Sequence, residues 1–265
     1  MFRYISTAAT RTGKRATNQD NYLIRDRYRP ADHENGAICL QDKTKYPAVF
    51  MVADGMGGEA SGEQASWLVC SELANKVVDV TAKKRIEDNM RIIEESILTS
   101  NAHLCEMMQE KKSGRMGSTV VLLLIQGKKA RVTNIGDSRA YLLRKGELTQ
   151  LTVDHTEGQM MLDAGVLTEE QLKKHPSRNK LSRHLGIFES EMKLDLPQYA
   201  EIKLEDRDIF LLCSDGVCGV LDDNSIAEIL GQKETPLTRR TSVLINAAYK
   251  AGSKDNMTAL VVEIQ

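Results

Sequence analysis

The sequence predicts an α+β fold, a four-layer αββα sandwich in which two antiparallel β-sheets are flanked by pairs of helices. Strand-like segments open the chain, dominate its middle and return in its last third, and a pair of helical segments follows the first and the last group. Glycine turns separate the middle strands at the spacing of hairpins. Because helices and sheets must bury their apolar faces against other elements, two stacked sheets between two helical layers satisfy these observations.

The first third of the chain is expected to hold three strands and two helices. Apolar and β-branched residues indicate strands at residues 4–10, 21–25 and 48–53. The apolar period then changes to that of a helix, with Ala65, Val69 and Leu73 on one face. The helices are expected at residues 62–80 and 86–108.

The middle and the last third are expected to alternate in the same way. Strands are expected at residues 118–125, 129–135, 139–144, 193–204, 208–214 and 257–264, and helices at residues 223–230 and 236–251. Residues 154–191 are polar and weakly helical, with short helices expected at 158–165 and 168–174 and a break at Pro176. We interpret this stretch as an inserted flap subdomain. Since no repeat or linker is evident, residues 1–265 are expected to form a single domain.

The composition is that of an ordinary soluble globular protein of 265 residues, with 36 basic and 37 acidic side chains. This balance argues against a nucleic-acid-binding surface, which needs a basic excess. The five cysteines form no CxxC pair, so neither a zinc site nor a disulfide framework is indicated. The longest apolar run, residues 120–125, is far shorter than a membrane span, and the N-terminus lacks a signal-peptide core. We therefore expect a cytoplasmic protein.

Five aspartates each lie where a strand meets a turn of glycine, serine or asparagine. They are Asp20, Asp54, Asp137, Asp215 and Asp255. The sharpest motif is at residues 54–58, where Gly-Met-Gly-Gly follows Asp54 at the expected end of a buried strand. Glycines allow a sharp turn and allow a carbonyl to point at an ion, although they also suit a plain tight turn. A nucleotide cradle is disfavoured because the Rossmann spacing and the P-loop lysine are missing.

These aspartates indicate a metal site when they are taken together. Singly, Asp-Gly, Asp-Ser and Asp-Asn are common turn pairs. Carboxylates crowded at the rim of buried sheets, however, repel each other and lose hydration, so they need a counter-charge. A divalent metal supplies it, and an all-oxygen cluster selects Mg²⁺ or Mn²⁺ rather than zinc. The residues thus predict a two-metal hydrolase that acts on a phosphate.

Seven short motifs follow one another in order along the chain. They are Arg15-x-x-Asn18-Gln19-Asp20, Asp54-Gly55-Met56-Gly57-Gly58-x-x-x-Gly62-Glu63, Met116-Gly117-Ser118-Thr119, Gly136-Asp137-Ser138-Arg139-x-Tyr141, Leu151-Thr152-x-Asp154-His155-Thr156, Leu212-Cys213-Ser214-Asp215-Gly216 and Asp255-Asn256. As a set they resemble the metal-dependent serine/threonine phosphatase family of type 2C, in particular its compact bacterial branch. The resemblance runs from Arg15 to the last strand and implies hydrolysis of phosphoserine and phosphothreonine in proteins.

The resemblance implies a cofactor of two Mn²⁺ or Mg²⁺ ions with a possible third. Asp54 would bridge the two ions, and Gly55 would offer its carbonyl to one of them. Asp215 and Asp255 would bind the other ion. Asp137 matches a ligand of the third, weaker ion.

Three further residues would serve the substrate and the water. Arg15 would bind the substrate phosphate, although alone it could also be a solvated turn arginine. Asp20 would hold a metal-bound water, and Gln19, where many members of the family carry glutamate, would orient water. The resemblance implies direct attack on phosphorus by a hydroxide that bridges the metals, without a phosphoenzyme, so Arg15 and Asp54 are the expected catalytic residues.

Met56 departs from the pattern because eukaryotic members place a histidine there that is thought to protonate the leaving group. A metal-bound water is our hypothesis for that acid. His155 is an alternative, and a structural histidine is its plainer interpretation. In the flap, Asn179 is a candidate ligand of the third ion. Basic side chains that either attract phosphopeptides or form a solvated charged face are Lys173, Lys174, Arg178, Lys180 and Arg183.

Two other functions stay open beside the phosphatase. One is a catalytically dead scaffold that binds phosphoproteins, and the other is a two-metal hydrolase of small phosphoesters or nucleotides. The intact aspartate motifs favour the phosphatase. Its expected partners are phosphorylated protein substrates and a cognate serine/threonine kinase, and we expect a monomer that binds neither nucleic acid nor membranes.

Overall fold

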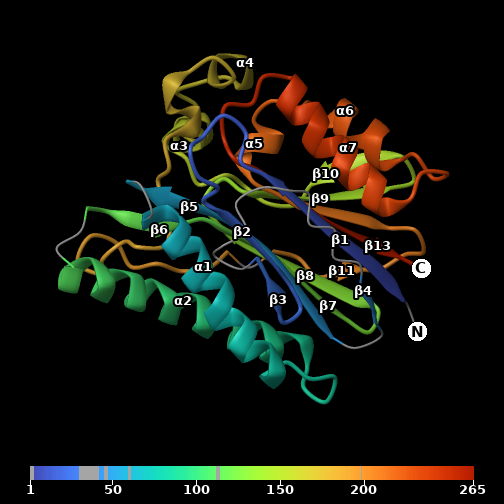
Figure 1. Cartoon of the computed structure of the whole chain (residues 1–265), viewed down its shortest axis with the longest axis horizontal. Helices are drawn as coiled ribbons and strands as arrows, with labels where there is room; N and C mark the ends of the chain where they lie inside the picture. Colours follow the sequence, from blue (N-terminus) through green and yellow to red (C-terminus); the bar gives the residue numbers. More distant parts are fainter. Residues whose placement is uncertain (1–2, 30–41, 45–46, 59–60, 112–113, 198) are drawn as a thin grey trace.

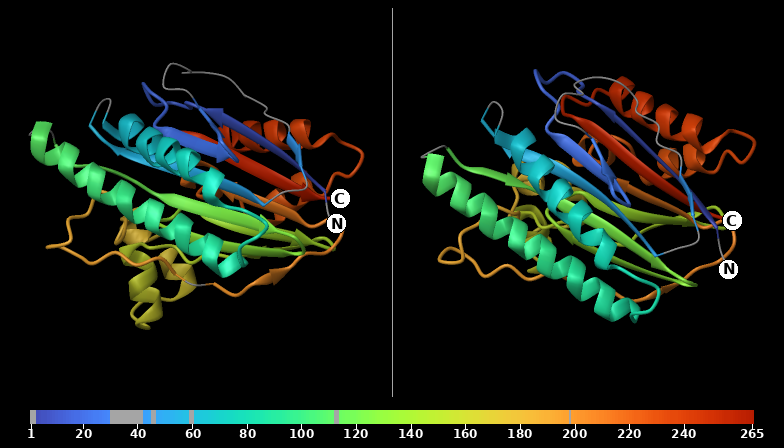
Figure 2. Two further views of the ribbon diagram at one scale, coloured as in Figure 1. Left: turned by 90° about the horizontal axis from the view of Figure 1, so that it is seen from below. Right: turned by 60° about the horizontal axis from the view of Figure 1, so that its bottom comes forward.

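The computed structural model describes residues 3–29, 42–44, 47–58, 61–111, 114–197 and 199–265. Two antiparallel sheets lie face to face in the middle of the molecule, and a pair of helices covers each outer face (Figures 1 and 2). The layer order is therefore αββα, which confirms the predicted fold class. In the chain segments that the structure describes, every helix is too short or too polar to cross a membrane.

Both sheets are built entirely from antiparallel pairs. The first sheet has the order β10-β9-β12-β13-β1-β4, and the second has the order β11-β8-β7-β5-β2-β3, with β6 paired to the end of β5. The strands of the first sheet are β1 (Tyr4–Arg11), β4 (Asp42–Thr44), β9 (Arg139–Arg144), β10 (Glu147–Gln150), β12 (Ile209–Cys213) and β13 (Met257–Ile264). Those of the second are β2 (Asp20–Ile24), β3 (Arg27–Tyr28), β5 (Ala48–Gly57), β6 (Met116–Ser118), β7 (Val120–Gln126), β8 (Lys129–Ile135) and β11 (Ile202–Lys203).

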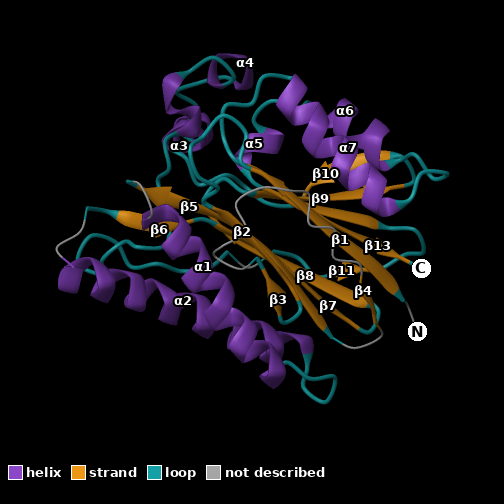
Figure 3. Ribbon diagram, in the orientation of Figure 1, coloured by secondary structure: helices purple, strands orange, loops and turns teal. Residues whose placement is uncertain are grey.

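Two helical pairs close the sandwich, as Figure 3 shows. On the second sheet lie α1 (Ser61–Lys76), continued by a 3₁₀ turn (Val77–Asp79), and α2 (Ile86–Lys111). On the first sheet lie α6 (Asp223–Leu230) and α7 (Leu237–Lys250), and the short α5 (Asp215–Cys218) follows β12 directly. The start of α6 is fixed by Asp222, whose side chain accepts a hydrogen bond from the backbone N–H of Ser225 at 2.8 Å.

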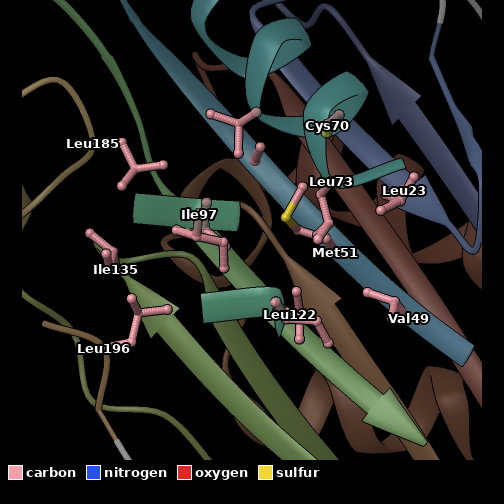
Figure 4. Close-up of a cluster of buried hydrophobic side chains, with 14 of the residues drawn as sticks. Leu23, Val49, Met51, Cys70, Leu73, Ile97, Leu122, Ile135, Leu185 and Leu196 are labelled. Atoms are coloured by element: carbon pink, nitrogen blue, oxygen red, sulfur yellow. The ribbon is translucent and has the colours of Figure 1, made fainter. Parts of the chain in front are cut away.

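The alternation of side chains along each strand divides the core into three buried clusters. Leu122 and Leu124 of β7 pack with α1 and α2, whereas Val121 and Leu123 lie between the two sheets. Figure 4 shows the helical side of β7, where Leu122 lies near Ile97 of α2. A third cluster joins the first sheet to α6 and α7. Because both faces of the inner strands are buried, their sequences read as nearly continuous apolar runs.

Most of the predicted elements are present, but the strand expected at residues 193–204 is wrong. Only Ile202–Lys203 forms a strand, paired with β8. Leu194 and Leu196 alternate inward and are buried, as in a strand, yet they belong to no ladder. Pro197 has no N–H to donate, and its carbonyl accepts a hydrogen bond from the side chain of Thr133 at 3.1 Å. The short elements β3, β4, β10 and α5 were not predicted.

The flap consists of two short helices and a 3₁₀ turn, as expected for a polar insertion. They are α3 (Glu157–Asp163), α4 (Glu169–Leu172) and the turn Pro176–Asn179. Pro176 occupies the first position of its turn, where its missing N–H costs nothing. Isolated bridges from Thr156 to Leu181 and from Ser118 to Leu185 close the base of the flap and tie it to the second sheet.

Candidate active site

The five predicted aspartates gather at one end of the sandwich, the end at which β12 leads into α5. Asp20 begins β2, Asp137 lies between β8 and β9, Asp215 begins α5, and Asp255 comes just before β13. Asp54 lies within β5, and its carboxyl feels the charges of all four others. Residues up to 235 positions apart, from Asp20 to Asp255, thus form one acidic cluster.

Asp54 is held in the middle of a strand, so the prediction that its strand ends there is wrong. β5 continues to Gly57, and residues 55–57 pair with β6. The backbone N–H of Asp54 donates to Oγ1 of Thr119 at 3.0 Å, and the N–H of Thr119 donates to the carbonyl of Asp54 at 2.8 Å. Across the sheet, Asp54 is the register partner of Asp20. The ladder therefore holds the backbones of both residues rigidly.

Gly55 is buried where three segments meet. Its N–H donates to the carbonyl of Gln19 at 3.0 Å. A Cβ on Gly55 would come within 1.9 Å of the carbonyl oxygen of Gly62, and a Cβ on Gly62 would come within 2.7 Å of the Gln19 side chain. Gly55 is needed because its Cβ would meet backbone atoms of Gly62 and Gln19, whereas a Cβ on Gly62 would displace the flexible end of the Gln19 side chain.

Two buried carboxylate oxygens have no hydrogen-bond partner among the described residues. They are Oδ1 of Asp20 and Oδ1 of Asp215. The other oxygen of Asp20 accepts a hydrogen bond from Oγ of Ser214 at 2.7 Å, and that Oγ accepts one from the backbone N–H of Thr258 at 3.0 Å. Leaving a buried acceptor unpaired costs about 1–3 kcal/mol, and more when it is charged. These two oxygens are therefore suited to a cation.

Arg15 lies beside the acidic cluster and pairs with Asp255. Its Nε donates to Oδ1 at 2.9 Å and its Nη2 to Oδ2 at 2.6 Å, a bidentate geometry. The Arg15 side chain is 59% exposed, so the guanidinium is accessible from solvent. Its positive charge also reaches Asp215 and Asp54. Arg15 is thus a cation of this site that an anion can approach from the solvent side.

Burial and mutual repulsion disturb the ionisation of the cluster. Burial raises the pKa of Asp20 to about 7, although the Thr258 and Ser214 hydroxyls oppose the shift. Burial also raises the pKa of Asp137 to about 8 and that of Asp215 to about 6, with Asp215 and Asp255 respectively as the next cause. The pKa of Asp54 lies well above its ordinary value, because of burial first and of Asp20 second. Carboxyls that resist ionisation in this way call for a counter-charge.

The donor set at this end fits a hard divalent cation. In the described part of the chain, no group of three or more acidic, histidine or cysteine side chains is arranged to hold a metal ion. An ion here would be held by carboxylates together with backbone and water oxygens, which are the ligands that Mg²⁺ prefers. The unpaired oxygens of Asp20 and Asp215 and the repulsion among the carboxyls favour such an ion.

Asn256 is a residue of the site that the sequence motifs contained but to which no role was assigned. Its Nδ2 donates to the carbonyls of Thr12 and Thr17 at 2.8 and 2.9 Å, and its Oδ1 accepts from the N–H of Gln19 at 2.8 Å. One buried amide therefore closes the loop that carries Arg15 and joins it to Asp255. The motif Asp255-Asn256 was the available signal, since an asparagine next to the predicted ligand Asp255 is suited to this bridging role.

The histidine alternative for the leaving-group acid gains no support from the geometry. Nδ1 of His155 accepts a hydrogen bond from the backbone N–H of Gly136 at 3.2 Å, and the backbone N–H of His155 donates to the Gly136 carbonyl at 3.0 Å. Burial lowers the pKa of His155, which favours the neutral ring. These contacts match the plainer interpretation of His155 as a structural residue that fixes the turn before Asp137.

The basic side chains of the flap are largely engaged with neighbouring groups. Arg178 donates to Oδ1 of Asn179 at 3.0 Å and to the carbonyls of Lys173 and Gly219 at 3.0 and 2.9 Å. Lys180 pairs with Glu157 at 2.7 Å, and Arg183 pairs with Asp195 at 3.1 Å. Arg178 thus joins the flap to the end of α5.

A pocket of about 750 Å³ opens between the flap and α5, next to the acidic cluster. Asp137 and Asp215 line it from the sheet side, and Asn179 and Arg178 line it from the flap. The pocket therefore provides room for a group of a substrate beside the aspartates. It also brings Asn179 to the same cavity as Asp137, the aspartate with which it was predicted to share an ion.

Comparison with known proteins identifies the family. The family model described as protein phosphatase 2C matches residues 31–260. The serine/threonine phosphatase stp of Listeria innocua is 32% identical over 240 residues, which cover 90% of this chain and 92% of the relative. The protein phosphatase PhpP of Streptococcus pneumoniae is 31% identical over 255 residues, covering 96% and 95% of the two chains.

Solved structures agree with this match. The serine/threonine phosphatase PstP/Ppp of Mycobacterium tuberculosis superposes with a TM-score of 0.80 at 30% identity, covering 98% of each chain. A catalytic domain of PstP in complex with 2 manganese ions superposes with a TM-score of 0.77 at 28% identity, covering 100% of this chain and 99% of that one. With its fold, its acidic cluster and these relatives in agreement, the chain belongs to the protein phosphatase 2C family and is a serine/threonine protein phosphatase.

Proposed function

We propose that this enzyme hydrolyses phosphoserine and phosphothreonine in proteins with the help of two Mn²⁺ or Mg²⁺ ions held at the acidic cluster. The observation that carries the proposal is the convergence of Asp20, Asp54, Asp137, Asp215 and Asp255, where burial and mutual repulsion raise the pKa of Asp54 and Asp20 even though Arg15 pairs with Asp255. The PstP structure that contains manganese supports the choice of ion.

We propose that Asp54 would be a ligand of both ions, because the charges of Asp20, Asp137, Asp215 and Asp255 all act on it. The Gly55 carbonyl would be a further ligand of one ion, and Asp215 and Asp255 would be further ligands of the other. Bound ions of this kind supply a water with lowered pKa and neutralise charge on the phosphoryl oxygens. Asp137 is proposed to hold a third ion.

The remaining residues bind and orient. Arg15 exchanges its bidentate contact with Asp255 for one with the substrate phosphate, which a planar guanidinium matches in the same way. Asp20 and Gln19 orient water, with Asp20 fixed by its hydrogen bond from Ser214. In this proposal a water held at the metal site, rather than Met56 or His155, would protonate the leaving group.

The decisive experiment is hydrolysis of p-nitrophenyl phosphate with Mn²⁺ and then with excess EDTA. We expect turnover with Mn²⁺ and its loss in EDTA. Turnover that is unchanged by EDTA would rule the mechanism out. No turnover under any metal condition would instead favour a phosphoprotein-binding scaffold.

The substrate class needs a second comparison. Phosphoserine and phosphothreonine peptides should be hydrolysed with a higher kcat/KM than nucleotides or sugar phosphates, since the pocket beside the cluster is large enough to take neighbouring side chains of a peptide. The reverse order would identify a hydrolase of small phosphoesters. A cognate kinase, the monomeric state and a cytoplasmic location stay predictions.

A further inference from the structure

We infer that Arg29 is a positioning residue of the metal centre, which fixes the backbone on both sides of Gln19 and thereby the position of Asp20. The inference rests on the proposed function, in which Asp20 serves the metal site. Arg29 follows β3, and its side chain is completely buried. Its Nε donates to the carbonyl of Asp20 at 3.0 Å, and its Nη2 donates to the carbonyl of Asn18 at 2.6 Å.

The β2–β3 hairpin delivers Arg29 to this place. Leu23 pairs with Tyr28, so the chain returns alongside the start of β2. The N–H of Arg29 donates to Oδ1 of Asn21 at 3.0 Å, and Nδ2 of Asn21 donates to the carbonyl of Arg29 at 3.1 Å. Both the backbone and the side chain of Arg29 are thus bound to residues 18–21.

Three consecutive carbonyls of this segment accept hydrogen bonds from outside it. Those of Asn18 and Asp20 accept from Arg29, whereas that of Gln19 accepts from the N–H of Gly55 and, at 2.6 Å, from Oγ of Ser66. With every carbonyl engaged, the segment cannot shift without breaking several buried hydrogen bonds. Asp20 therefore keeps a fixed position relative to Asp54, its register partner on β5.

A carboxylate of α1 forms an ion pair with Arg29. Oε1 of Glu63, in the first turn of α1, lies 3.6 Å from Nη2 of Arg29 and is itself mostly buried. A buried ion pair is seldom more stabilising than apolar side chains of the same volume. A planar guanidinium differs from lysine and from apolar side chains because its rigid fork holds donors on separate nitrogens in a fixed geometry. Two carbonyls on either side of Gln19 match that geometry.

Arg240 provides a matched control at the opposite end of the sandwich. It is 4% exposed, its Nη1 donates to the carbonyl of Leu230 at 2.6 Å, and it pairs with Glu263. It is thus also a buried arginine with a carbonyl acceptor and a carboxylate partner. None of its partners belongs to the acidic cluster, so its loss should affect stability alone.

The experiment compares Arg29→Met with Arg240→Met in the full chain. Mn²⁺ binding is measured by calorimetry without substrate, and amide hydrogen exchange of residues 15–21 is measured without metal. Groups that orient metal ligands typically change metal affinity about 10- to 100-fold when they are removed. We expect Arg29→Met to weaken Mn²⁺ binding by about that factor and to speed exchange in residues 15–21, and Arg240→Met to do neither while lowering the melting temperature.

A second variant protects the test against misfolding. Arg29→Lys keeps the charge near Glu63 but replaces the rigid fork by donors on a single nitrogen, so its Mn²⁺ affinity should fall between those of the wild type and Arg29→Met. The inference is overturned if Arg29→Met or Arg29→Lys binds Mn²⁺ as the wild type does, or if Arg240→Met weakens binding equally. Since the wild type is assayed alongside for EDTA-sensitive turnover, a failure of the inference is distinct from a failure of the proposed function.

Discussion

The acidic side chains at the two ends of strands β12 and β13 differ in how far they are paired with basic side chains. At one end, Asp208 precedes β12 and accepts two hydrogen bonds from Arg144 at 2.8 and 2.7 Å, and Glu263 near the end of β13 pairs with Arg240. At the other end, Asp215 follows β12 and has a buried oxygen without a hydrogen-bond partner in the described parts of the chain. The pairs of Asp208 and Glu263 balance the charges at the first end, which we call the paired end, whereas at the acidic cluster Arg15 pairs with Asp255 and buried oxygens of Asp20 and Asp215 stay unpaired among the described residues.

This difference distinguishes residues that stabilise the fold from residues that bind metal or substrate. Buried, paired carboxylates cost little, while crowded and unpaired ones destabilise the folded chain. A cluster of that kind is typical of functional sites, such as those that hold cations. The same substitution at the two ends should therefore affect different properties.

The largest effect is expected for Asp54→Asn in the acidic cluster. It removes the charge that we assign to bridging two ions. Because polarisation by metals is worth several kcal/mol, kcat for p-nitrophenyl phosphate should fall by roughly 10³-fold or more. Steady-state kinetics at saturating Mn²⁺ measures this, and activity close to wild type would contradict the assignment.

The matched change at the paired end is Asp208→Asn. Asp208 is 1% exposed and also accepts the N–H of Glu205 at 2.8 Å, so the variant leaves buried donors poorly matched. We expect the free energy of unfolding to drop by about 2–3 kcal/mol, with kcat unchanged. Urea denaturation and the same kinetic assay separate the two quantities. If Asp208→Asn lowered kcat as much as Asp54→Asn does, the paired end would not differ in function from the acidic cluster.

The pH dependence of stability should come from the acidic cluster. In the metal-free protein the pKa values of Asp20, Asp137 and Asp215 are raised to about 7, 8 and 6 from an ordinary value of 3.8. Between about pH 4 and pH 8 the folded state holds protons that the unfolded state has lost, so stability falls as the pH rises through this window. Mn²⁺ replaces those protons, so its stabilising effect should grow over the same interval.

Thermal unfolding in EDTA and in Mn²⁺ tests this from about pH 5 to pH 8.5. We expect the melting temperature in EDTA to decline by several degrees and the gap between the two conditions to widen. A melting temperature in EDTA that rises across the range would show that the carboxyls ionise freely.

The smallest effect is expected for Arg15→Lys. A lysine keeps the charge but loses the bidentate geometry, so KM for a phosphopeptide should rise about five- to tenfold while kcat changes less. Arg11→Lys is the control, because Arg11 donates to Asn246 and stacks on Tyr249 outside the cluster. Equal KM values for Arg15→Lys and the wild type would indicate that Arg15 is a solvated turn residue that does not bind the phosphate.

Elements with a strong local pattern could be predicted from the sequence. The strands at residues 129–135, 139–144 and 257–264 and the helix at residues 223–230 have the predicted bounds, because their apolar periods decide between strand and helix locally. Residues 193–197 carry a strand-like alternation but belong to no ladder, and only the tertiary arrangement reveals this. Short strands such as β3 bury too little surface to leave a pattern.

The acidic residues of the site could be found because each carboxylate lies beside glycine, serine or asparagine in a motif. The residues that support them are harder to find. Arg29 and Asn256 act on backbone carbonyls, which every residue has, so their partners leave no mark in the sequence. The arginine pairing of Asp255 also needs three-dimensional proximity between residues 240 positions apart.

The termini of the described chain meet at the paired end, where Arg3 and Gln265 exchange backbone hydrogen bonds at 2.9 and 2.7 Å (Figure 1). A strand advances about 3.3 Å per residue, so the length of β13 alone sets this point roughly 25 Å from Asp255. A dye or a surface anchor attached after Gln265 would leave the reaction centre open to large phosphoproteins. Immobilised enzyme could then be used to measure how fast phosphoproteins bind from solution and dissociate after dephosphorylation.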